Sequence, residues 1–334
     1  MDLLINGAAV SGSSMGVKRF YAGLMKYFTW PGRVTVIDPA GGPVVARVKE
    51  LLQRGRRDAI FWSPSHRGPL SAHHHVITVY DCINVEYVYR DDWRLPIYRR
   101  LFNKVLGNAQ VVVALSQSTK DAILRNYMVD VSRIVVIPAG YDSPVMPAVE
   151  DKGTSPGDQA PFVLMVTNAL PHKNTVNACL AFARSQAHQR GFALRVVGSL
   201  KDEARAICRE ANVNLQLYSR VDDNVLGAWY RTCRFLFSPT LAEGYNLPIA
   251  EALSLGANVL CSDIPVHREF YDGEVEFFEV GNPEAMVSAL NAAFTRDGRW
   301  FAAQTTRHTR SFRDVAAEYR ALFQRVAAGL PIQG

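Results

Sequence analysis

Short apolar runs alternate with segments of helical period along this 334-residue chain. Helices are predicted at Val17–Phe28, Val44–Arg54, Thr119–Tyr127, Thr175–Gln189, Lys201–Ala211, Pro248–Leu255 and Pro283–Thr295. Strands are predicted at Leu3–Ile5, Val34–Ile37, Ala59–Trp62, Val76–Val79, Val111–Leu115, Ile134–Ile137, Phe162–Val166, Leu194–Val197, Leu215–Leu217, Phe235–Ser238, Val259–Cys261 and Val275–Phe278. This alternation is typical of α/β proteins, in which helices cover both faces of a parallel sheet.

The pattern divides near the middle of the chain. Residues 141–160 are rich in Pro, Gly, Ser and Asp and show no apolar period, which is typical of an interdomain linker. We therefore predict two doubly wound, Rossmann-like domains at 1–145 and 146–310, followed by an amphipathic helix within 311–334. Ligands of such sheets bind at the carboxyl ends of the strands, so an interdomain cleft is the expected binding place.

The positive charge is concentrated in the first half. Residues 1–150 hold 18 Lys and Arg against 12 Asp and Glu, whereas the remainder holds 19 of each. A basic half favours an anionic partner, which can be a phosphorylated ligand, a nucleic acid or an anionic membrane, although an ordinary basic surface explains it equally well. No nucleic-acid partner is expected, because the basic residues form no nucleic-acid-binding motif.

The cysteines and the start of the chain indicate a cytoplasmic protein. Five cysteines are scattered singly, without a CxxC pair, which suits a reducing compartment. No apolar run is long enough to span a membrane, and the first residues lack the basic start of a signal peptide.

The richest segment is 235–256, FLFSPTLAEGYNLPIAEALSLG. A buried strand is followed by a loop that contains Glu243, and a helix is expected between Pro248 and Gly256. The N–H groups of a helix start attract anions, so two carboxylates beside them suit a ligand with a diphosphate and sugar hydroxyls. Alternatively, Glu243 is a solvated loop residue and Glu251 only complements the helix dipole.

The segment from Ser238 to Phe270 resembles the donor-binding region of the retaining glycosyltransferases of family 4, in which E-G-[FY]-G-L-P-x-x-E-A recurs. The matching residues are Glu243, Gly244, Tyr245, Leu247, Pro248, Glu251, Ala252, Gly256 and Val259. Asn246 replaces the usual glycine. The resemblance implies that Glu243 approaches the donor sugar, that Glu251 holds the nucleotide ribose, and that Gly244, Tyr245, Asn246 and Leu247 lie against the donor.

Two further segments of the second half resemble parts of this family. Residues 163–175, VLMVTNALPHKNT, place Lys173 where the family holds the donor diphosphate, with His172 in place of the usual arginine. A departing diphosphate needs such a cation, because negative charge develops on it. Residues 215–226 imply that Arg220 and Val221 meet the nucleotide base.

The first half also carries resembling segments. Residues 11–20 are similar to the family's glycine-rich loop, which implies that Gly16 lies against the donor diphosphate. After the strand that ends at Val79, Tyr80 takes the place of the usual histidine near the donor sugar, and Asp81 is retained. We expect Asp81, Glu243 and Lys173 to be the catalytic groups. The change at Tyr80 suggests an unusual donor, such as a 6-deoxy sugar.

No metal site is predicted. His73, His74 and His75 are adjacent in an extended segment, so their side chains point to alternate faces and cannot converge. Asp91 and Asp92 lie in a charged stretch that is expected to be helical, away from any strand end. A metal-independent reaction is therefore expected.

Residues 89–104 interleave basic and aromatic side chains: Arg90, Arg94, Arg99, Arg100 and Lys104 with Trp93, Tyr98 and Phe102. Such a segment suits an anionic membrane surface or a lipid-diphosphate acceptor. An ordinary surface helix is the alternative.

The resemblance spans most of the chain and implies the GT-B fold, with the last helix returning to the first domain. It implies transfer of a hexosyl unit (mannose, glucose or a deoxyhexose such as rhamnose) from a UDP-, GDP- or dTDP-sugar to an acceptor hydroxyl, with retention and without a cofactor. The expected setting is cell-surface polysaccharide or glycolipid synthesis at the inner face of the cytoplasmic membrane, where the acceptor glycan can be lipid-linked. A nucleotide-sugar epimerase of the same fold and a non-catalytic sugar-nucleotide-binding protein stay open as alternatives.

Overall fold

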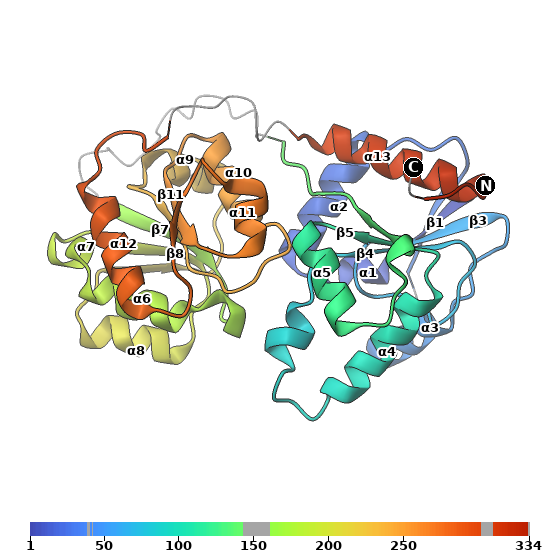
Figure 1. Ribbon diagram of the computed structural model, residues 1–334, viewed down its shortest axis with the longest axis horizontal. Coiled ribbons are helices and arrows are strands. Elements are labelled where there is room, and N and C mark those ends of the chain that lie inside the picture. The colour runs from blue at the N-terminus through green and yellow to red at the C-terminus, as the bar shows by residue number, and fades with distance from the viewer. Residues whose placement is uncertain (39–40, 42, 143–160, 302–309, 333–334) are drawn as a thin grey trace. The chain divides into compact units, whose positions relative to one another are not determined.

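The computed structural model describes residues 1–38, 41, 43–142, 161–301 and 310–332, so most of the predicted linker lies outside the described residues (Figure 1). Contacts divide the chain into two compact units. The first unit comprises Met1–Asp142 and Arg310–Gly334, and the second comprises Ser143–Thr309. These boundaries lie within a few residues of the predicted ones.

The first unit contains a parallel sheet of strand order β2-β1-β3-β4-β5-β6. Its strands are β1 (Asp2–Asn6), β2 (Val34–Ile37), β3 (Ala59–Ser63), β4 (His75–Val79), β5 (Val111–Ala114) and β6 (Ile134–Val136). Its helices are α1 (Ala8–Ser11), α2 (Met15–Tyr27), α3 (Pro43–Leu52), α4 (Leu95–Asn108), α5 (Gln117–Asn126) and α13 (Phe312–Ala327), with the short π-helix η1 (Asn84–Val88) and the 3-10 helix η2 (Val131–Arg133). The helices cover both faces of the sheet (Figure 1).

The second unit contains a parallel sheet of strand order β12-β11-β10-β7-β8-β9. Its strands are β7 (Phe162–Thr167), β8 (Ala193–Gly198), β9 (Leu215–Tyr218), β10 (Leu236–Ser238), β11 (Val259–Ser262) and β12 (Glu276–Phe278). Its helices are η3 (Pro171–Lys173), α6 (Thr175–Arg184), α7 (Gln186–Gln189), α8 (Asp202–Glu210), α9 (Asp223–Thr232), α10 (Leu247–Ser254), α11 (Pro265–Tyr271) and α12 (Pro283–Thr295).

Every predicted strand is confirmed to within two residues, because each is a short run rich in apolar residues. The inner strands are buried, whereas the edge strands β2 and β9 are more exposed. Two helix predictions need correction. The predicted helix Thr175–Gln189 is interrupted at Ser185, whose hydroxyl donates to the Phe182 carbonyl at 2.7 Å. Asp91 and Asp92 lie in a non-helical segment before α4.

The last helix, α13, completes the core of the first unit. Its predicted apolar stripe is buried, namely Phe312, Val315, Tyr319, Leu322, Phe323 and Val326. The Tyr319 hydroxyl is hydrogen-bonded to Thr78 Oγ1 in β4 at 2.9 Å. Helix α13 lies beside α2 (Figure 1), and a methyl group added at Gly23 of α2 would come within 2.4 Å of the Phe312 ring. This close approach explains the glycine.

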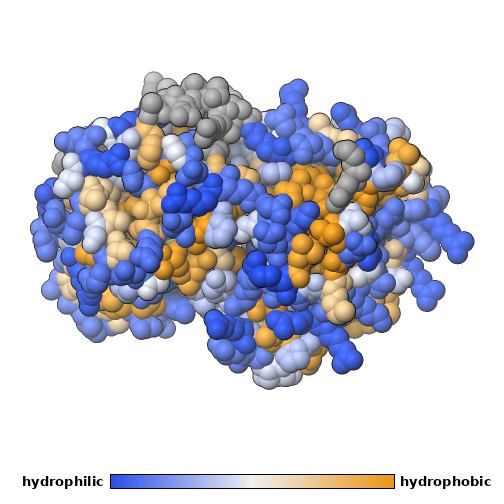
Figure 2. Space-filling model, in the orientation of Figure 1, coloured by the Kyte–Doolittle hydropathy of each residue, from blue (hydrophilic) through white to orange (hydrophobic). Residues whose placement is uncertain are grey.

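Hydrophilic side chains cover most of the face shown in Figure 2, with apolar patches between them. Among the residues that the structure describes, no helix combines the length and apolar character that a membrane crossing requires.

Candidate functional site

Two loops of the second unit meet at the carboxyl end of its sheet. One follows β7 and forms η3, and the other follows β10 and leads into α10; β7 and β10 are neighbouring strands. These loops bring together two of the three predicted catalytic residues, since Lys173 Nζ lies 2.5 Å from Glu243 Oε1. Both side chains are largely covered, with exposed fractions of 16% and 12%.

The backbone beside this ion pair is fixed by hydrogen bonds that pass between the two loops. The carbonyl of His172 accepts from the Leu241 N–H at 2.7 Å and from Thr240 Oγ1 at 3.1 Å. The Ser262 hydroxyl, at the end of β11, donates to the Thr240 carbonyl. The backbone that carries Lys173 is therefore positioned by contacts among the ends of β7, β10 and β11.

The electrostatics of the pair favour an ionised Glu243. Burial would raise the pKa of the Glu243 carboxyl, but the nearby Lys173 and His172 oppose it, and the pKa lies below its ordinary value. Burial lowers the pKa of His172 to about 4, so this side chain is neutral near pH 7. His172 consequently does not supply the second positive charge that the family's arginine would provide at this position.

Asn246, which stands where glycine is usual, lies between this loop and α10. Its backbone is left-handed, with φ of 70°, a conformation that Asn tolerates better than most residues. Its buried amide donates to Ser238 Oγ at 3.0 Å and to His267 Nε2 at 2.9 Å. Asn246 thus ties α10 to β10 and α11, which a glycine could not do.

His267 is a buried neutral residue in this network. Its Nδ1 lies 2.8 Å from the Ser262 carbonyl, which can only accept, so Nδ1 carries the proton and Nε2 accepts from Asn246. Burial lowers the pKa of His267 to about 4, in agreement with this assignment. The sequence pattern did not single out His267.

Glu251 lies inside α10 and is only 8% exposed. Its Oε2 accepts a hydrogen bond from the Tyr230 hydroxyl of α9 at 3.0 Å. Pro248 stands in the first turn of α10, and Gly256 follows its last turn with φ of 81°, as the sequence predicts.

The residues between Glu243 and α10 are packed into the unit. Gly244 and Tyr245 are buried, and the Tyr245 ring contacts the Phe270 ring at a centroid distance of 4.7 Å. The Tyr271 hydroxyl donates to the Tyr245 carbonyl at 2.8 Å. Leu247 is half-buried at the start of α10. These residues fix the path of the loop that carries Glu243.

Arg220 and Val221 lie in the loop after β9, the edge strand of this sheet, and Arg220 is exposed. Within the described part of the chain, no hydrogen bond or ion pair links either residue to Lys173 or Glu243. Their predicted contact with a nucleotide base stays a prediction.

The remaining predicted site residues belong to the first unit. Gly16 is exposed in the first turn of α2, and a methyl group there would approach only Ser14 Oγ, at 3.9 Å. Tyr80 follows β4, but its hydroxyl is buried and its ring meets Phe20 edge to face at 5.3 Å. Asp81 is half-buried, and its Oδ1 accepts from the Ile83 N–H at 3.0 Å.

The ion pair and the amino end of α10 can bind an anion next to a hydroxyl-bearing group. Lys173 supplies a cation, and the helix start adds the positive end of its dipole. Among the described residues, no group of three His, Cys, Asp or Glu side chains is arranged to hold a metal ion.

The sequence pattern missed four residues that organise this site: Tyr230, Thr240, His267 and Tyr271. Each acts by a contact with a residue distant along the chain, for example Tyr230 with Glu251 and His267 with Asn246. One sequence alone contains no signal that separates such buried polar residues from ordinary ones.

Two family models match consecutive parts of the chain. "Glycosyltransferase Family 4" matches residues 27–143, and "Glycosyl transferases group 1" matches residues 148–300. Among curated proteins, the O-antigen chain mannosyltransferase RfbU of Salmonella typhimurium is 26% identical over 221 residues, which are 64% of this chain and 59% of that protein. The serotype-specific mannosyltransferase WbdA of Escherichia coli is 25% identical over 137 residues, which are 39% of this chain and 17% of that protein. The matched regions therefore span less than two thirds of either relative.

Solved structures show the same fold at low sequence identity. A glycosyltransferase from Rickettsia africae ESF-5 has a TM-score of 0.65 at 14% identity, over 97% of this chain and 98% of that chain. WaaG, a glycosyltransferase involved in lipopolysaccharide biosynthesis, has a TM-score of 0.61 at 13% identity, over 98% of each chain. These likenesses confirm the predicted GT-B class of two α/β units with parallel sheets. The two family models together cover most of the sequence, and this chain belongs to glycosyltransferase family 4.

Proposed function

We propose that this chain is a glycosyltransferase that moves a hexosyl unit from a nucleotide diphosphate sugar to the hydroxyl of an acceptor glycan. The ion pair between Lys173 and Glu243 carries the proposal, because it places a cation and a carboxylate together at the carboxyl end of a parallel sheet. Membership of family 4 and the names of the two mannosyltransferase relatives support it. The proposed setting is cell-surface polysaccharide or glycolipid synthesis, with mannose as the first sugar to test and glucose and rhamnose as alternatives.

In the proposed reaction, Lys173 and the amino end of α10 receive the diphosphate of the donor. Negative charge grows on the diphosphate as the bond to the sugar breaks, so a cation at this point stabilises the transition state more than the bound donor. One such contact contributes about 2.7–4 kcal/mol in other enzymes. Since His172 is neutral near pH 7, Lys173 is the main side-chain cation at this position.

Glu243 and Glu251 have separate roles in this proposal. Glu243 is ionised and accepts hydrogen bonds from sugar hydroxyls, which requires that its contact with Lys173 loosens when the diphosphate binds. Glu251 accepts from the ribose hydroxyls while Tyr230 holds its carboxylate in place. We also propose that the reaction retains the anomeric configuration and needs neither metal nor cofactor, as expected from the sequence resemblance.

Donor binding tests this proposal directly. Thermal unfolding is measured with a panel of UDP-, GDP- and dTDP-sugars, since a donor that binds the folded protein at one hundred times its Kd stabilises it by about 2.7 kcal/mol. We expect one donor to raise the Tm, and Lys173→Met to abolish that rise. If no nucleotide sugar shifts the Tm, or if Lys173→Met retains the full shift, the proposed function is wrong.

The role of Glu251 is tested with a matched pair of variants. Glu251→Gln removes the charge that would hold the ribose, and Tyr230→Phe removes only the hydrogen bond that positions this carboxylate. We expect Glu251→Gln to weaken donor binding at least tenfold and Tyr230→Phe to weaken it less. An equal loss in both variants would assign Glu251 a structural role only.

We further propose that the chain works at the cytoplasmic face of a membrane, through the exposed start of α4. Trp93 and Ile97 are 78% and 61% exposed there, beside the exposed cations Arg90, Arg99, Arg100 and Lys104. Exposed apolar and aromatic groups flanked by cations suit an anionic membrane interface. Of the three aromatic residues that suggested this surface, only Trp93 faces outward, because Phe102 is buried and Tyr98 is half-buried.

Flotation with anionic liposomes tests this surface. Arg99→Glu combined with Arg100→Glu should reduce the fraction of protein that floats. The control combines Arg54→Glu with Arg57→Glu, which are also exposed residues of the first unit. Equal flotation of the two double variants would rule out this membrane surface.

A further inference from the structure

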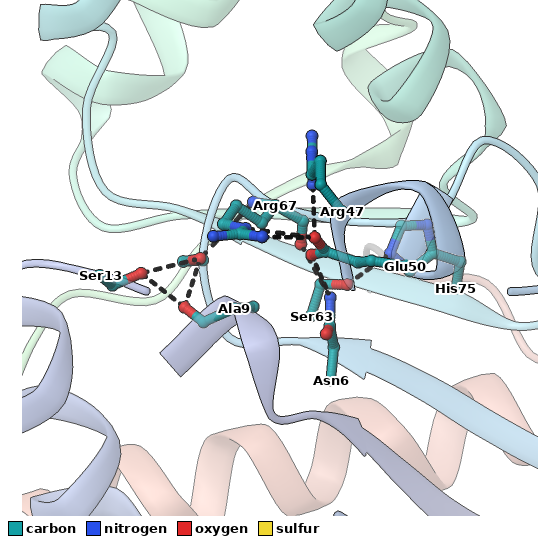
Figure 3. Close-up of polar contacts among 9 residues, drawn as sticks. Asn6, Ala9, Ser13, Arg47, Glu50, Ser63, Arg67 and His75 are labelled. Atoms are coloured by element: carbon teal, nitrogen blue, oxygen red, sulfur yellow. Dashed lines mark hydrogen bonds and ion pairs between the residues drawn. The ribbon is translucent and has the colours of Figure 1, made fainter. Parts of the chain in front are cut away.

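A buried carboxylate lies between two arginines in the first unit, remote in sequence from every predicted site residue. Glu50 of α3 has no exposed surface, and its Oε2 accepts from Arg47 Nη1 at 2.7 Å and from Arg67 Nη2 at 2.7 Å. Its Oε1 accepts from Asn6 Nδ2 at 2.9 Å. Figure 3 shows the Glu50 carboxylate between the Arg47 and Arg67 side chains, with Asn6 approaching from β1.

This cluster carries one excess positive charge. Burial would raise the pKa of Glu50, but hydrogen bonds from Arg67, Asn6 and Arg47 outweigh it and hold the pKa below its ordinary value. Glu50 is therefore ionised near pH 7 and balances one of the two guanidinium groups. Its neighbour His66 is neutral, since burial and the two arginines lower its pKa to about 4.

Arg67 is fixed in position by several contacts. Arg67 Nε lies 3.2 Å from the same Glu50 oxygen that Nη2 contacts, and a methyl group added at Gly12 would come within 2.4 Å of Arg67 Nη1. The guanidinium of Arg67 is thus held between α3 and the glycine-rich loop. A fixed guanidinium loses little conformational freedom when it binds a ligand.

The two arginines form one wall of a cavity of about 410 Å³. His66 lies beside them, and the remaining lining comes from Tyr98, Leu101, Phe102 and Val105. These four residues recur at helical spacing, so one face of α4 forms the apolar part of the lining. A cavity of this size falls in the range of small-molecule sites, about 300–1,000 Å³.

We propose that this cavity binds the phosphate ester of an acceptor whose neighbouring part is apolar. Arg47 and Arg67 bind the phosphate oxygens, because guanidinium groups present paired N–H donors at the spacing of these oxygens. Tyr98 and Leu101, the half-buried residues of this face of α4, pack against the apolar chain, whereas Phe102 and Val105 are buried. This site rests on the proposed function, to which it adds the chemical class of the acceptor, and it uses none of the proposed donor-binding residues.

The single carboxylate has a definite consequence for the ligand. The two guanidinium groups would repel each other without Glu50, which binds both of them and holds them close together. Its single negative charge balances one of the two positive charges, so one positive charge remains for an anionic ligand. A neutral sugar would gain nothing from this excess charge. A phosphate ester neutralises it, so the structure favours an anionic acceptor over a neutral one.

Binding of geranyl phosphate tests the proposal. Its affinity is measured by calorimetry on the full chain and compared with those of inorganic phosphate, which lacks the apolar chain, and geraniol, which lacks the phosphate. Geranyl phosphate should bind at least about tenfold more tightly than either, because both walls of the cavity contribute. Comparable affinity for inorganic phosphate would show that a free anion, and not a phosphate ester with an apolar chain, is the ligand.

Arg47→Met assigns the site. This variant leaves Arg67 paired with Glu50 and should weaken geranyl phosphate binding about tenfold or more, as the loss of one charge-assisted contact predicts. Leu101→Asn, in the apolar part of the lining, should weaken it as well. Arg57→Met, which removes an exposed charge outside the cavity, should not. The proposal is overturned if Arg47→Met binds geranyl phosphate as tightly as the parent protein does.

The nucleotide-sugar shift in Tm is measured on the same preparations. A preserved shift shows that a variant is folded and keeps its donor site. If the parent protein binds donors but not geranyl phosphate, the acceptor proposal fails and the proposed function stands. If it binds no donor, the proposed function itself fails.

Discussion

Replacing Asn246 by glycine, the residue that family 4 usually has at this position, should destabilise the second unit. The substitution does not strain the backbone, since glycine adopts φ of 70° readily. It removes the amide that donates to Ser238 Oγ and His267 Nε2. Although glycine is the usual residue of the family, we therefore expect it to make this chain less stable than asparagine does at position 246.

The magnitude follows from the groups left behind. His267 has no exposed surface, so its Nε2 acceptor would lose its partner without gaining water. A buried polar group without a partner costs about 1–3 kcal/mol, and we take about 2 kcal/mol. Relief of the left-handed conformation and the greater chain entropy of glycine, each about 1 kcal/mol, oppose one another. A loss of about 2 kcal/mol lowers the Tm of a unit of this size by roughly 4–8 °C.

Differential scanning calorimetry of Asn246→Gly measures this loss, with Asn212→Gly as the matched control. Asn212 also has a left-handed backbone, with φ of 52°, but its side chain is exposed. The control therefore repeats the backbone change without the buried hydrogen bonds, and its Tm should change by less than about 2 °C. Equal Tm values for the two variants would refute the structural role of the Asn246 amide.

The effect of Asn246→Gly should also depend on pH. An N–H that points at His267 Nε2 opposes protonation there, so its removal raises the pKa of His267 from about 4. The variant then loses less stability than the parent protein as pH falls from 6.5 towards 4, and the difference between them should shrink. A constant difference across this range would contradict the assigned tautomer.

Three further predictions concern other parts of the chain. Lys173→Met should raise the pKa of Glu243, because Lys173 opposes the effect of burial on that carboxyl. NMR titration of the Glu243 carboxyl measures this pKa, with Lys201→Met as an exposed control. An unchanged pKa would contradict the ion pair. Gly16→Ala should preserve the Tm, since its methyl group would approach only Ser14 Oγ, at 3.9 Å, and should reduce donor turnover if Gly16 lies against the donor diphosphate as expected. Gly23→Ala should lower the Tm by forcing Phe312 away, and similar Tm values for both variants would be inconsistent with the packing of α13. His172 and His267 have pKa values of about 4 in the folded protein, so between pH 6.5 and pH 4 the unfolded chain binds more protons than the folded one. The free energy of unfolding should therefore be highest above pH 6.5 and should fall by about 3 kcal/mol for each histidine by pH 4. Urea denaturation across this range measures the loss, and a flat profile would exclude it.

The sheets could be predicted because each strand is a short run rich in apolar residues and bounded by turns, and the inner strands are buried on both faces. The start and stop of α10 could also be predicted, because Pro248 and Gly256 limit the backbone locally. Helix α5 begins at Gln117, two residues before the predicted start at Thr119, and Ser116 caps it by accepting from the Thr119 N–H at 2.9 Å. The end of a helix is uncertain by a residue or two in sequence.

The site could be predicted only where a local motif carries it. Lys173 and Glu243 lie in segments that resemble the family, and the structure joins them although 70 positions separate them. The functions of Asn246 and His172 could not be predicted, because both depend on burial and on partners from other loops. Asn246 departs from the family pattern yet gains two hydrogen bonds, and the burial of His172 removes a charge that its residue type would allow.

The return of α13 to the first unit affects the order in which a newly made chain can fold. Trp62 of β3 and Thr78 of β4 are synthesised early, but Tyr319, which packs against the first and bonds to the second, emerges only after residues 143–309. The second unit is therefore the first to have all of its residues outside the ribosome. Until α13 arrives, the apolar surface that it covers, which includes Phe20 of α2 and Trp62 of β3, is exposed. This surface is the expected target of chaperones during synthesis.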